Sequence, residues 1–242
     1  MAESFAKLKE SFIFNFIEGA RWKYITNGLL VTLKVTFFAL LLGIAIGVVV
    51  AMIRSAYDQM KDEMKPGFGK TMLTVLNTIA RLYLTVIRGT PVVVQLLIGY
   101  FVIFVSTTNT VFVASMGFGI NSGAYITEII RGGIMSIDPG QFEAGRSLGF
   151  DYFQTMRFIV IPQAFKNVLP ALANEFIALL KETAVCGYIG LMDLTKGGDV
   201  IRGRTFSAFM PLLAVALIYL LLVIVFSKLV GILERRLRRN EH

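Results

Sequence analysis

Long runs of apolar residues, separated by short polar stretches, dominate the pattern along this chain. No charged residue occurs between positions 35 and 53, or between positions 206 and 227. Each run is close to the roughly 20 residues that a helix needs to cross the hydrocarbon core of a bilayer. A third uncharged tract, over 89–127, is too long for one crossing and contains breakers such as Pro91, Asn109 and Gly117. It therefore predicts parts of two crossings.

The pattern predicts about five transmembrane helices, the second of them broken. The helical stretch that begins at residue 71 would exceed a membrane thickness by residue 105, and Gly89, Thr90 and Pro91 interrupt it near its middle. Splitting 71–107 into two crossings would give a sixth helix, and this alternative stays open. The predicted crossings cover residues 25–53, 71–105 with the break, 121–137, 165–188 and 206–233.

These crossings predict an all-α integral membrane protein with one transmembrane domain over 25–235. Residues 1–24 precede it and predict an interfacial helix, with an apolar stripe of Phe5, Phe12, Ile13, Phe16 and Ile17. Residues 236–242 follow it as a basic tail. No repeat of 20–50 residues is visible. If the transport pathway is symmetric, a second chain must supply its other half.

Composition supports lipid surroundings and excludes several kinds of chemistry. Hydrophobic residues make up 55% of the 242 positions and charged ones only 17%, against roughly a quarter in soluble domains. The single Cys186 excludes an internal disulfide framework, and the single His242 excludes a histidine-based metal site or catalytic triad. The stretch 67–71 lacks the first glycine of a phosphate-binding loop, which would fall at Met64. We expect neither an enzyme nor a nucleotide site.

The basic residues predict an orientation in the membrane. The net charge of +8 could suggest nucleic acid binding, but arginines cluster at the ends of crossings and in the tail. The positive-inside rule explains them better. It places residues 54–70, 138–166 and the tail in the cytoplasm and the N-terminus outside. No removable signal peptide is visible, because the first long apolar run starts only near Leu29.

Two short capped helices are predicted between the third and fourth apolar crossings. Asp138, Pro139 and Gln141 form a helix start in which the two polar side chains can exchange hydrogen bonds with the backbone. Gly149 can end that helix, and Asp151 begins a second start of the same kind. Small residues in the first helix would let a partner approach its backbone closely. The alternative is an ordinary polar loop between crossings.

Residues 143–162 also carry a spaced motif. It consists of Glu143-Ala144-Gly145, three residues, Gly149, nine residues and Ile159-Val160-Ile161-Pro162. This resembles the cytoplasmic motif of bacterial ATP-binding-cassette importer permeases, which is Glu-Ala-Ala, three residues, Gly, nine residues and Ile-x-Leu-Pro. The departures are Gly145 for the second Ala and Ile161 for Leu. Similarity to the branch that imports polar amino acids comes from Arg88-Gly89-Thr90-Pro91 with Gln95, Ala124-Tyr125 with Glu128 and Arg131-Gly132-Gly133, and Leu180-Lys181-Glu182-Thr183.

The resemblance implies a permease subunit of an ATP-driven importer in the bacterial plasma (inner) membrane, with a polar amino acid, including the basic ones, as substrate. The two short helices would dock into a cleft of the ATPase, whose closure on ATP drives alternating access. The implied partners are ATP-binding-cassette ATPase subunits, a second permease copy, most simply in a homodimer, and an extracellular or periplasmic substrate-binding protein. ATP and Mg²⁺ would sit on the ATPase, with no cofactor on this chain. The implied coupling residues are Asp138, Gln141, Glu143, Ala144, Gly145, Arg146 and Gly149.

Ionisable residues inside the predicted crossings provide a candidate substrate site. Such residues are costly in lipid, so they face protein or a water-filled path. An amino acid carries a carboxylate and an ammonium group, which call for a cation and an anion at fixed separation. Arg81 and Glu128 would serve, and the break after Arg88 would offer free backbone groups. The substrate-binding candidates are Arg81, Thr85, Arg88, Gln95, Tyr125 and Glu128.

Other interpretations of these residues stay open. Glu128 or Glu182 could instead pair with an arginine or lysine to hold helices together. An ion-coupled secondary transporter or channel would use Glu128 and the arginines to bind protons or ions, without an ATPase. Glu182 or Glu175 could serve a basic substrate, whereas Asn174 and Gln95 would suit glutamine. Small residues at every fourth position, Ala39, Gly43, Gly47 and Ala51, predict close helix packing, within the chain or against a second subunit.

Overall fold

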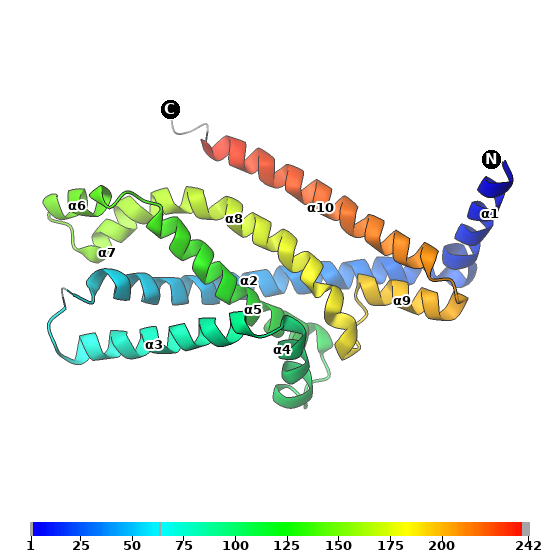
Figure 1. The fold of residues 1–242 in the computed structure, drawn as a ribbon, viewed down its shortest axis with the longest axis horizontal. Coiled ribbons are helices and arrows are strands. Elements are labelled where there is room, and N and C mark those ends of the chain that lie inside the picture. The colour runs from blue at the N-terminus through cyan, green and yellow to red at the C-terminus, as the bar shows by residue number, and fades with distance from the viewer. Residues whose placement is uncertain (1, 63, 239–242) are drawn as a thin grey trace. The chain divides into compact units, whose positions relative to one another are not determined.

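The computed structural model describes residues 2–62 and 64–238, with side chains described for 6–62 and 64–237. All regular elements in this part of the chain are helices (Figure 1), which confirms the all-α prediction. They are α1 (Ala2–Phe12), η1 (Ile13–Ile17), η2 (Glu18–Ala20), α2 (Trp22–Met60), α3 (Phe68–Gly89), α4 (Val92–Ile98), η3 (Gly99–Ile103), α5 (Thr110–Met135), α6 (Gly140–Ser147), α7 (Tyr152–Thr155), η4 (Met156–Val160), α8 (Ile161–Glu182), η5 (Thr183–Ile189), α9 (Leu194–Thr205) and α10 (Phe209–Arg238).

Two helices of the described chain, α2 and α10, are each long and apolar enough to cross a membrane, with mean hydropathies of 2.7 and 2.9 over an 18-residue stretch of each. A third crossing results if α3 and the bent continuation over Val92–Ile103 count as one span. Helices α5 and α8 contain 26 and 22 residues but carry more polar and charged side chains. Five crossings therefore stay a prediction.

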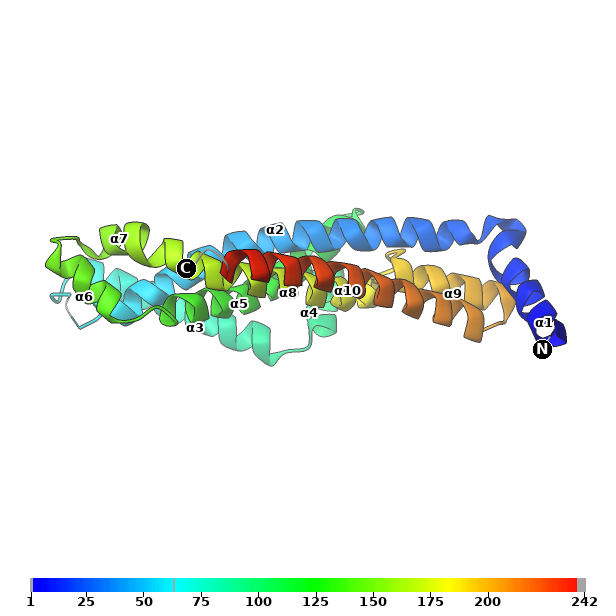
Figure 2. The ribbon, with the colours of Figure 1, turned by 90° about the horizontal axis from the view of Figure 1, so that it is seen from above.

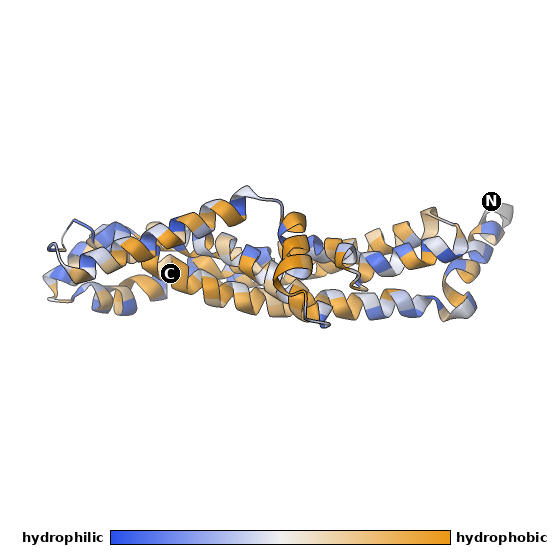
Figure 3. Ribbon diagram, turned by 90° about the horizontal axis from the view of Figure 1, so that it is seen from below, coloured by the Kyte–Doolittle hydropathy of each residue, from blue (hydrophilic) through white to orange (hydrophobic). Residues whose placement is uncertain are grey.

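The predicted break in the second crossing is confirmed. Helix α3 ends at Gly89, Thr90 adopts an extended conformation with φ −123° and ψ 147°, and α4 begins at Val92. Pro91 accounts for this, because proline disfavours helical geometry in the residue before it. Helix α4 is hydrophobic along its length apart from Gln95 (Figure 3).

One prediction about a helix breaker was wrong. Gly117 does not break a helix, since α5 already begins at Thr110, and a Cβ on Gly117 would lie 3.4 Å from Leu96 Cδ1. Its small size serves packing instead. Between the last two predicted crossings, the chain forms helix α9, whose start is capped by Asp193 accepting hydrogen bonds from the backbone of Thr195 and Lys196.

The N-terminal residues are helical as predicted, with a kink at Gly19, where φ is +60°. Their apolar stripe divides: Phe12 and Ile17 are about half exposed, whereas Phe16 is buried. The side chain of Phe5 lies outside the described residues. At the other end, α10 continues through Arg238, so the predicted tail is partly helical, and residues 239–242 lie outside the described part.

The chain divides into two compact units, each assembled from three stretches. The first comprises Met1–Ala39, Val93–Phe118 and Ile177–Leu229. Within it the start of α2 packs closely on α9: a Cβ on Gly28 would lie 2.5 Å from the Asp193 carbonyl oxygen, and Leu194 N donates to Thr32 Oγ1 over 3.1 Å. Its buried core consists of Phe16, Ile25, Leu194, Ile201 and Val215.

Replacing Gly197 by alanine is expected to destabilise this first unit. The added Cβ would overlap the backbone carbonyl of Tyr24 on α2, which cannot rotate away. Overpacking of this kind costs about 1–3 kcal/mol. The melting temperature in detergent should therefore fall by several degrees.

Gly203→Ala supplies the matched control, because Gly203 lies on the same helix with no atom within 4 Å of an added Cβ. Its melting temperature should equal that of the parent chain or exceed it slightly. Equal melting temperatures for both variants would contradict the close α2–α9 contact.

The second unit comprises Leu40–Val92, Gly119–Phe176 and Val230–His242. In it the small-residue ridge of α2 meets α5: a Cβ on Gly43 would lie 3.3 Å from Gly123 N, and one on Gly47 would lie 2.5 Å from Ile126 Cγ2. This answers the open question for these two glycines, which pack against the same chain. Tyr83 on α3 also joins α5 by donating to the Ile120 carbonyl oxygen over 2.6 Å.

A second buried core lies at the end of this unit that carries α6 and α7. It consists of Ile134, Ile137, Met156, Val160 and Ala164, with Phe142 of α6 and Tyr152 of α7 packed against it. The two short helices lie side by side (Figures 1 and 2). They are therefore anchored on the ends of α5 and α8.

Candidate functional site

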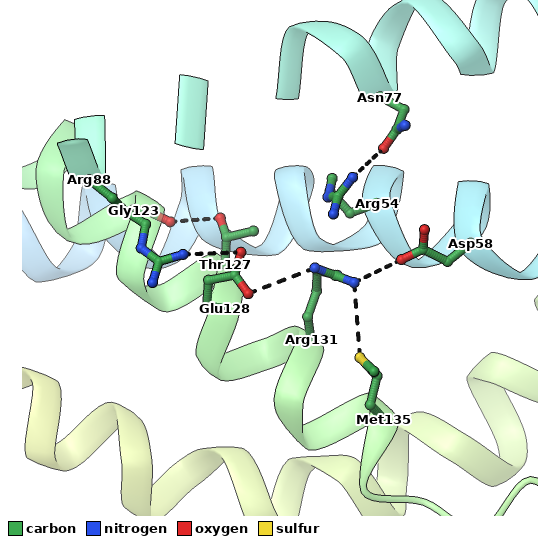
Figure 4. A network of polar contacts seen from close by, with 9 residues as sticks. All are labelled: Arg54, Asp58, Asn77, Arg88, Gly123, Thr127, Glu128, Arg131 and Met135. Atoms are coloured by element: carbon green, nitrogen blue, oxygen red, sulfur yellow. Dashed lines mark hydrogen bonds and ion pairs between the residues drawn. The ribbon is translucent and has the colours of Figure 1, made fainter. Parts of the chain in front are cut away.

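A network of charged side chains joins α2, α3 and α5 within the second unit (Figure 4). Glu128 on α5 lies between two guanidinium groups, 3.5 Å from Arg88 and 3.7 Å from Arg131. Arg131 pairs more tightly with Asp58 on α2, over 2.8 Å, and Arg54 donates to Asn77 over 2.9 Å. We call Arg54, Asp58, Arg88, Glu128 and Arg131 the arginine–carboxylate cluster.

The cluster has a buried end and an open end. The Arg131 side chain is 14% exposed, whereas Glu128 is 36% and Arg88 45% exposed. Arg88 also lies over the Tyr125 ring, 5.7 Å from its centroid. Three guanidinium groups face two carboxylates, which leaves one positive charge in excess. The open end can therefore accept a ligand that brings a carboxylate.

The structure places the predicted substrate residues as follows. Arg81, Thr85 and Arg88 are all exposed, and their spacings of four and three residues put them on one face of α3. Arg88 rather than Arg81 pairs with Glu128, because Arg81 lies two turns, about 10 Å, further back along the helix. Tyr125 joins Arg88 at the open end. Gln95 lies on α4 in the first unit, and its contribution stays a prediction.

Sequence reasoning missed Arg54 and Asp58, because both were assigned to a polar loop. Helix α2 in fact continues to Met60, so the two residues share one helix face at a spacing of four. That spacing was the available signal. A missed contact also involves Glu175 on α8, whose Oε1 accepts a hydrogen bond from Ser122 over 2.8 Å.

Helix α7 has the start signal that the sequence predicted, and α6 has part of it. Asp151 and Gln154 form a complete capping box, with hydrogen bonds of 2.8 and 2.9 Å. At α6 the Asp138 carboxylate accepts from Gly140 N over 2.7 Å. The predicted reciprocal role of Gln141 is not seen among the described hydrogen bonds; its side-chain oxygen accepts from Gln163 over 3.3 Å.

Gly149 ends α6 as predicted. Its φ is +80°, and the next residue, Phe150, donates its N–H to the Gly145 carbonyl oxygen over 3.0 Å. This left-handed residue with a hydrogen bond back into the last turn is a common helix ending. The chain can then reverse sharply into α7.

The small residues of α6 face two directions. Glu143, Ala144 and Arg146 are exposed, in agreement with a docking surface, whereas Gly145 is buried. A Cβ on Gly145 would lie 2.6 Å from Thr155 Oγ1 on α7. The close approach that Gly145 permits is therefore within the chain, between α6 and α7, rather than to a partner.

A cavity of about 460 Å³ joins the arginine–carboxylate cluster to α6. Asp58 and Arg131 line it from one side, and Phe142, Glu143 and Arg146 line it from the other. A neighbouring cavity of about 300 Å³ reaches Tyr152 on α7. Burial, with a smaller contribution from Asp58, raises the pKa of Tyr152 to about 12, so its phenol stays neutral.

Comparisons with known proteins identify a matching family. The family described as binding-protein-dependent transport system inner membrane component matches residues 69–239. The chain is 36% identical over 210 residues to a glutamine transport system permease protein of Escherichia coli, covering 85% of this chain and 90% of that protein. It is 34% identical over 221 residues to an arginine transport system permease protein of Bacillus subtilis, covering 90% and 94%.

A similar fold is found among solved structures. A crystal structure of an amino acid ABC transporter with histidines has a TM-score of 0.79 and 38% identity, covering 91% of this chain and 98% of that chain. An inward-facing methionine ABC transporter has a TM-score of 0.75 at 19% identity, which supports the fold alone. These findings favour the importer over the ion-coupled alternative. The chain belongs to the family of binding-protein-dependent transport system inner membrane components, the permeases of ATP-binding-cassette importers.

Proposed function

We propose that this chain is the membrane permease subunit of an ATP-driven importer of polar amino acids. Family membership supports the importer, and the glutamine and arginine permeases among its relatives support the substrate class. The observation that carries the substrate class is the Glu128 carboxylate between Arg88 and Arg131, on helices of a membrane protein. This arrangement offers both charges that an amino acid backbone requires.

In the proposed complex, Arg88 binds the substrate carboxylate and Glu128 binds the ammonium group. Both side chains are partly exposed, and their 3.5 Å separation is long for a charge-assisted hydrogen bond. A substrate can therefore separate them at small cost. The excess positive charge of the cluster favours the added carboxylate. Tyr125 lies beside Arg88 at this position, and Thr85, Arg81 and Gln95 stay candidates that the sequence predicts.

Contacts to the substrate side chain determine whether this site selects a neutral or a basic amino acid. Glu175 is a further carboxylate in the same unit and already accepts a hydrogen bond from Ser122. A basic side chain would be stabilised by such an anion. Glutamine would instead use an amide group such as that of Asn174 on α8, in the same unit. Competition between labelled arginine and glutamine for uptake distinguishes the two.

Transport requires partners that supply ATP hydrolysis and substrate. Helices α6 and α7 dock the ATPase, which binds ATP and Mg²⁺, while this chain binds no cofactor. A second permease copy completes the pathway as a homodimer. An external substrate-binding protein delivers the amino acid. In this arrangement α6 and the C-terminus lie in the cytoplasm of a bacterium and the N-terminus lies outside its plasma membrane.

Reconstitution of the permease with its ATPase and binding protein in liposomes tests the proposal. We expect uptake of labelled glutamine or arginine that depends on ATP on the ATPase side. Amino acids that are transported should also stimulate ATP hydrolysis when the binding protein is present. Uptake that continues without ATP, driven by a proton or sodium gradient, would refute the proposal.

Replacing Glu143 by lysine is expected to weaken the complex with the ATPase by about tenfold or more. Glu143 is exposed on α6, and its negative charge lies beside Arg146 on the proposed docking surface. Charge reversal at an interface costs up to several kcal/mol. Affinity purification of the complex with a tagged ATPase measures the effect.

Asp62→Lys serves as the control, because Asp62 is an exposed carboxylate in the turn after α2 and outside α6. It should co-purify with the ATPase like the parent chain. Retention of a full complex by Glu143→Lys would remove Glu143 from the docking surface.

A further inference from the structure

Arg131 occupies the centre of the arginine–carboxylate cluster without reaching its open end. It contacts two carboxylates, Asp58 over 2.8 Å and Glu128 over 3.7 Å (Figure 4). Its side chain is only 14% exposed, so it is the most enclosed member of the three ion pairs that involve Glu128 or Asp58. An arginine shared between two carboxylates can shift its pairing from one to the other.

The two distances show where that pairing rests in this conformation. At 2.8 Å, Arg131 and Asp58 form a charge-assisted hydrogen bond, whereas 3.7 Å to Glu128 leaves only an electrostatic attraction. Asp58 therefore holds the Arg131 guanidinium away from Glu128. As a result, neither Arg88 nor Arg131 comes closer than 3.5 Å to the Glu128 carboxylate in the described structure, and Glu128 can receive a substrate ammonium group.

Removal of Asp58 would change this balance. Arg131 would lose its short partner while remaining largely enclosed, and an enclosed unpaired charge is costly. Glu128 is the remaining carboxylate within ion-pair reach in the described structure. Arg131 would then turn to Glu128 and compete with the substrate for the same carboxylate.

The Asp58–Arg131 pair also lies where the docking helix could affect it. Both residues line the cavity of about 460 Å³ together with Phe142, Glu143 and Arg146 of α6. A displacement of α6 would alter the wall of this cavity and the electrostatic surroundings of the pair. The pair is thus a physical connection between the docking helix and Glu128.

We infer that Asp58 and Arg131 are positioning residues that set the affinity of Glu128 for the substrate. Arg131 bound to Asp58 leaves Glu128 available, and Arg131 bound to Glu128 favours release of the substrate. No covalent chemistry is involved, only exchange of one ion pair for another. This inference rests on the proposed function, because it takes Glu128 as the group that binds the substrate ammonium.

Uptake kinetics of the complete complex in liposomes test the inference, with whichever of L-glutamine or L-arginine the parent complex transports. Asp58→Asn is expected to raise the KM about tenfold, a size typical of coupled charge pairs, and to change kcat less than about threefold. Asp58→Glu should restore most of the affinity. The double variant Asp58→Asn with Arg131→Gln should also return the KM toward the parent value, because the competitor for Glu128 is gone.

Recovery in the double variant separates positioning from a structural role. If Asp58 only stabilised the helices, removal of Arg131 as well would leave the KM raised or worsen it, and this result would overturn the inference. An unchanged KM in Asp58→Asn would overturn it too. Asp62→Asn, an exposed carboxylate four residues on, should keep the parent KM.

The stability of each variant complex is checked by its melting temperature and yield. If Asp58→Asn assembles poorly, the KM of Asp58→Glu is measured instead. Its longer side chain retains the negative charge, so its KM should rise less than threefold. A parent complex that transports no amino acid would refute the proposed function. A transporting parent without recovery in the double variant would refute only the present inference.

Discussion

Exchange of Glu128 for glutamine is expected to reduce amino acid uptake by about 30- to 100-fold. Glutamine keeps the size of the side chain but removes the negative charge that receives the substrate ammonium. It also leaves Arg54, Arg88 and Arg131 with Asp58 as the one remaining carboxylate of the cluster. Loss of one partner from a desolvated charge pair typically costs 2–5 kcal/mol, and partial exposure of Glu128 places the expected effect at the lower end. Initial uptake rates in liposomes over a range of substrate concentrations measure it.

The loss should appear mainly in KM, because a substrate ammonium still finds the neutral amide oxygen of glutamine. Glu10→Gln removes a carboxylate from α1, outside the cluster, and should leave uptake unchanged. Basal ATP hydrolysis of the Glu128→Gln complex should also remain within about twofold of the parent, since α6 and α7 are unaltered. If the single variants Glu128→Gln and Arg88→Ala both take up substrate normally, the substrate site lies elsewhere.

The contrast between Arg81 and Arg88 shows what sequence reasoning could and could not determine about this site. Their spacing correctly places both on one face of α3, because that follows from helix geometry alone. Which of the two arginines pairs with Glu128 depends on the axial register of α3 against α5. Tyr83 and its hydrogen bond to the Ile120 carbonyl oxygen help to set that register. Nothing local in the sequence specifies it.

The position of a helix end explains a second difference between prediction and structure, the length of α2. Hydropathy ended the first crossing at the first charge, Arg54, whereas α2 continues to Met60. A helix can carry charges in its last turns where partners such as Asn77 and Arg131 neutralise or solvate them. Those partners come from other helices, so the chain pattern alone could not show them. Asp58 was consequently overlooked.

Helices α6 and α7 were predicted more closely, because their signals are local. Asp151 with Gln154, and Gly149 at the end of α6, act within a few residues of the backbone groups that they satisfy. The role of Gly145 required the structure, since its neighbour Thr155 is ten positions away. The family motif has alanine at this position, and the partner on α7 explains why glycine is suited to this chain.

Exchange of Gly145 for valine is expected to reduce uptake by about tenfold or more while the chain remains in the membrane. The added Cβ would lie 2.6 Å from Thr155 Oγ1 and 2.7 Å from Thr155 Cγ2, well inside van der Waals contact. Thr155 is buried and β-branched, so it cannot rotate freely out of the way. Helix α6 must then move away from α7, at a cost of about 1–3 kcal/mol. Uptake and substrate-stimulated ATP hydrolysis in liposomes measure the loss of coupling.

Size at this contact, rather than the identity of residue 145, determines the expected outcome. Gly145→Ala should cause a smaller loss, and Thr155→Ala should relieve it, because the added Cβ would then meet only the Cβ of residue 155, at 3.2 Å. Gly231→Val provides a control, since an added Cβ at Gly231 has no neighbour within 4 Å. If Gly145→Val transports normally, the packing of α6 on α7 does not transmit the movement of the ATPase. Gly145→Val could also lose uptake while Thr155→Ala fails to restore the uptake of Gly145→Ala. In that case residue 145 acts through direct contact with the ATPase instead.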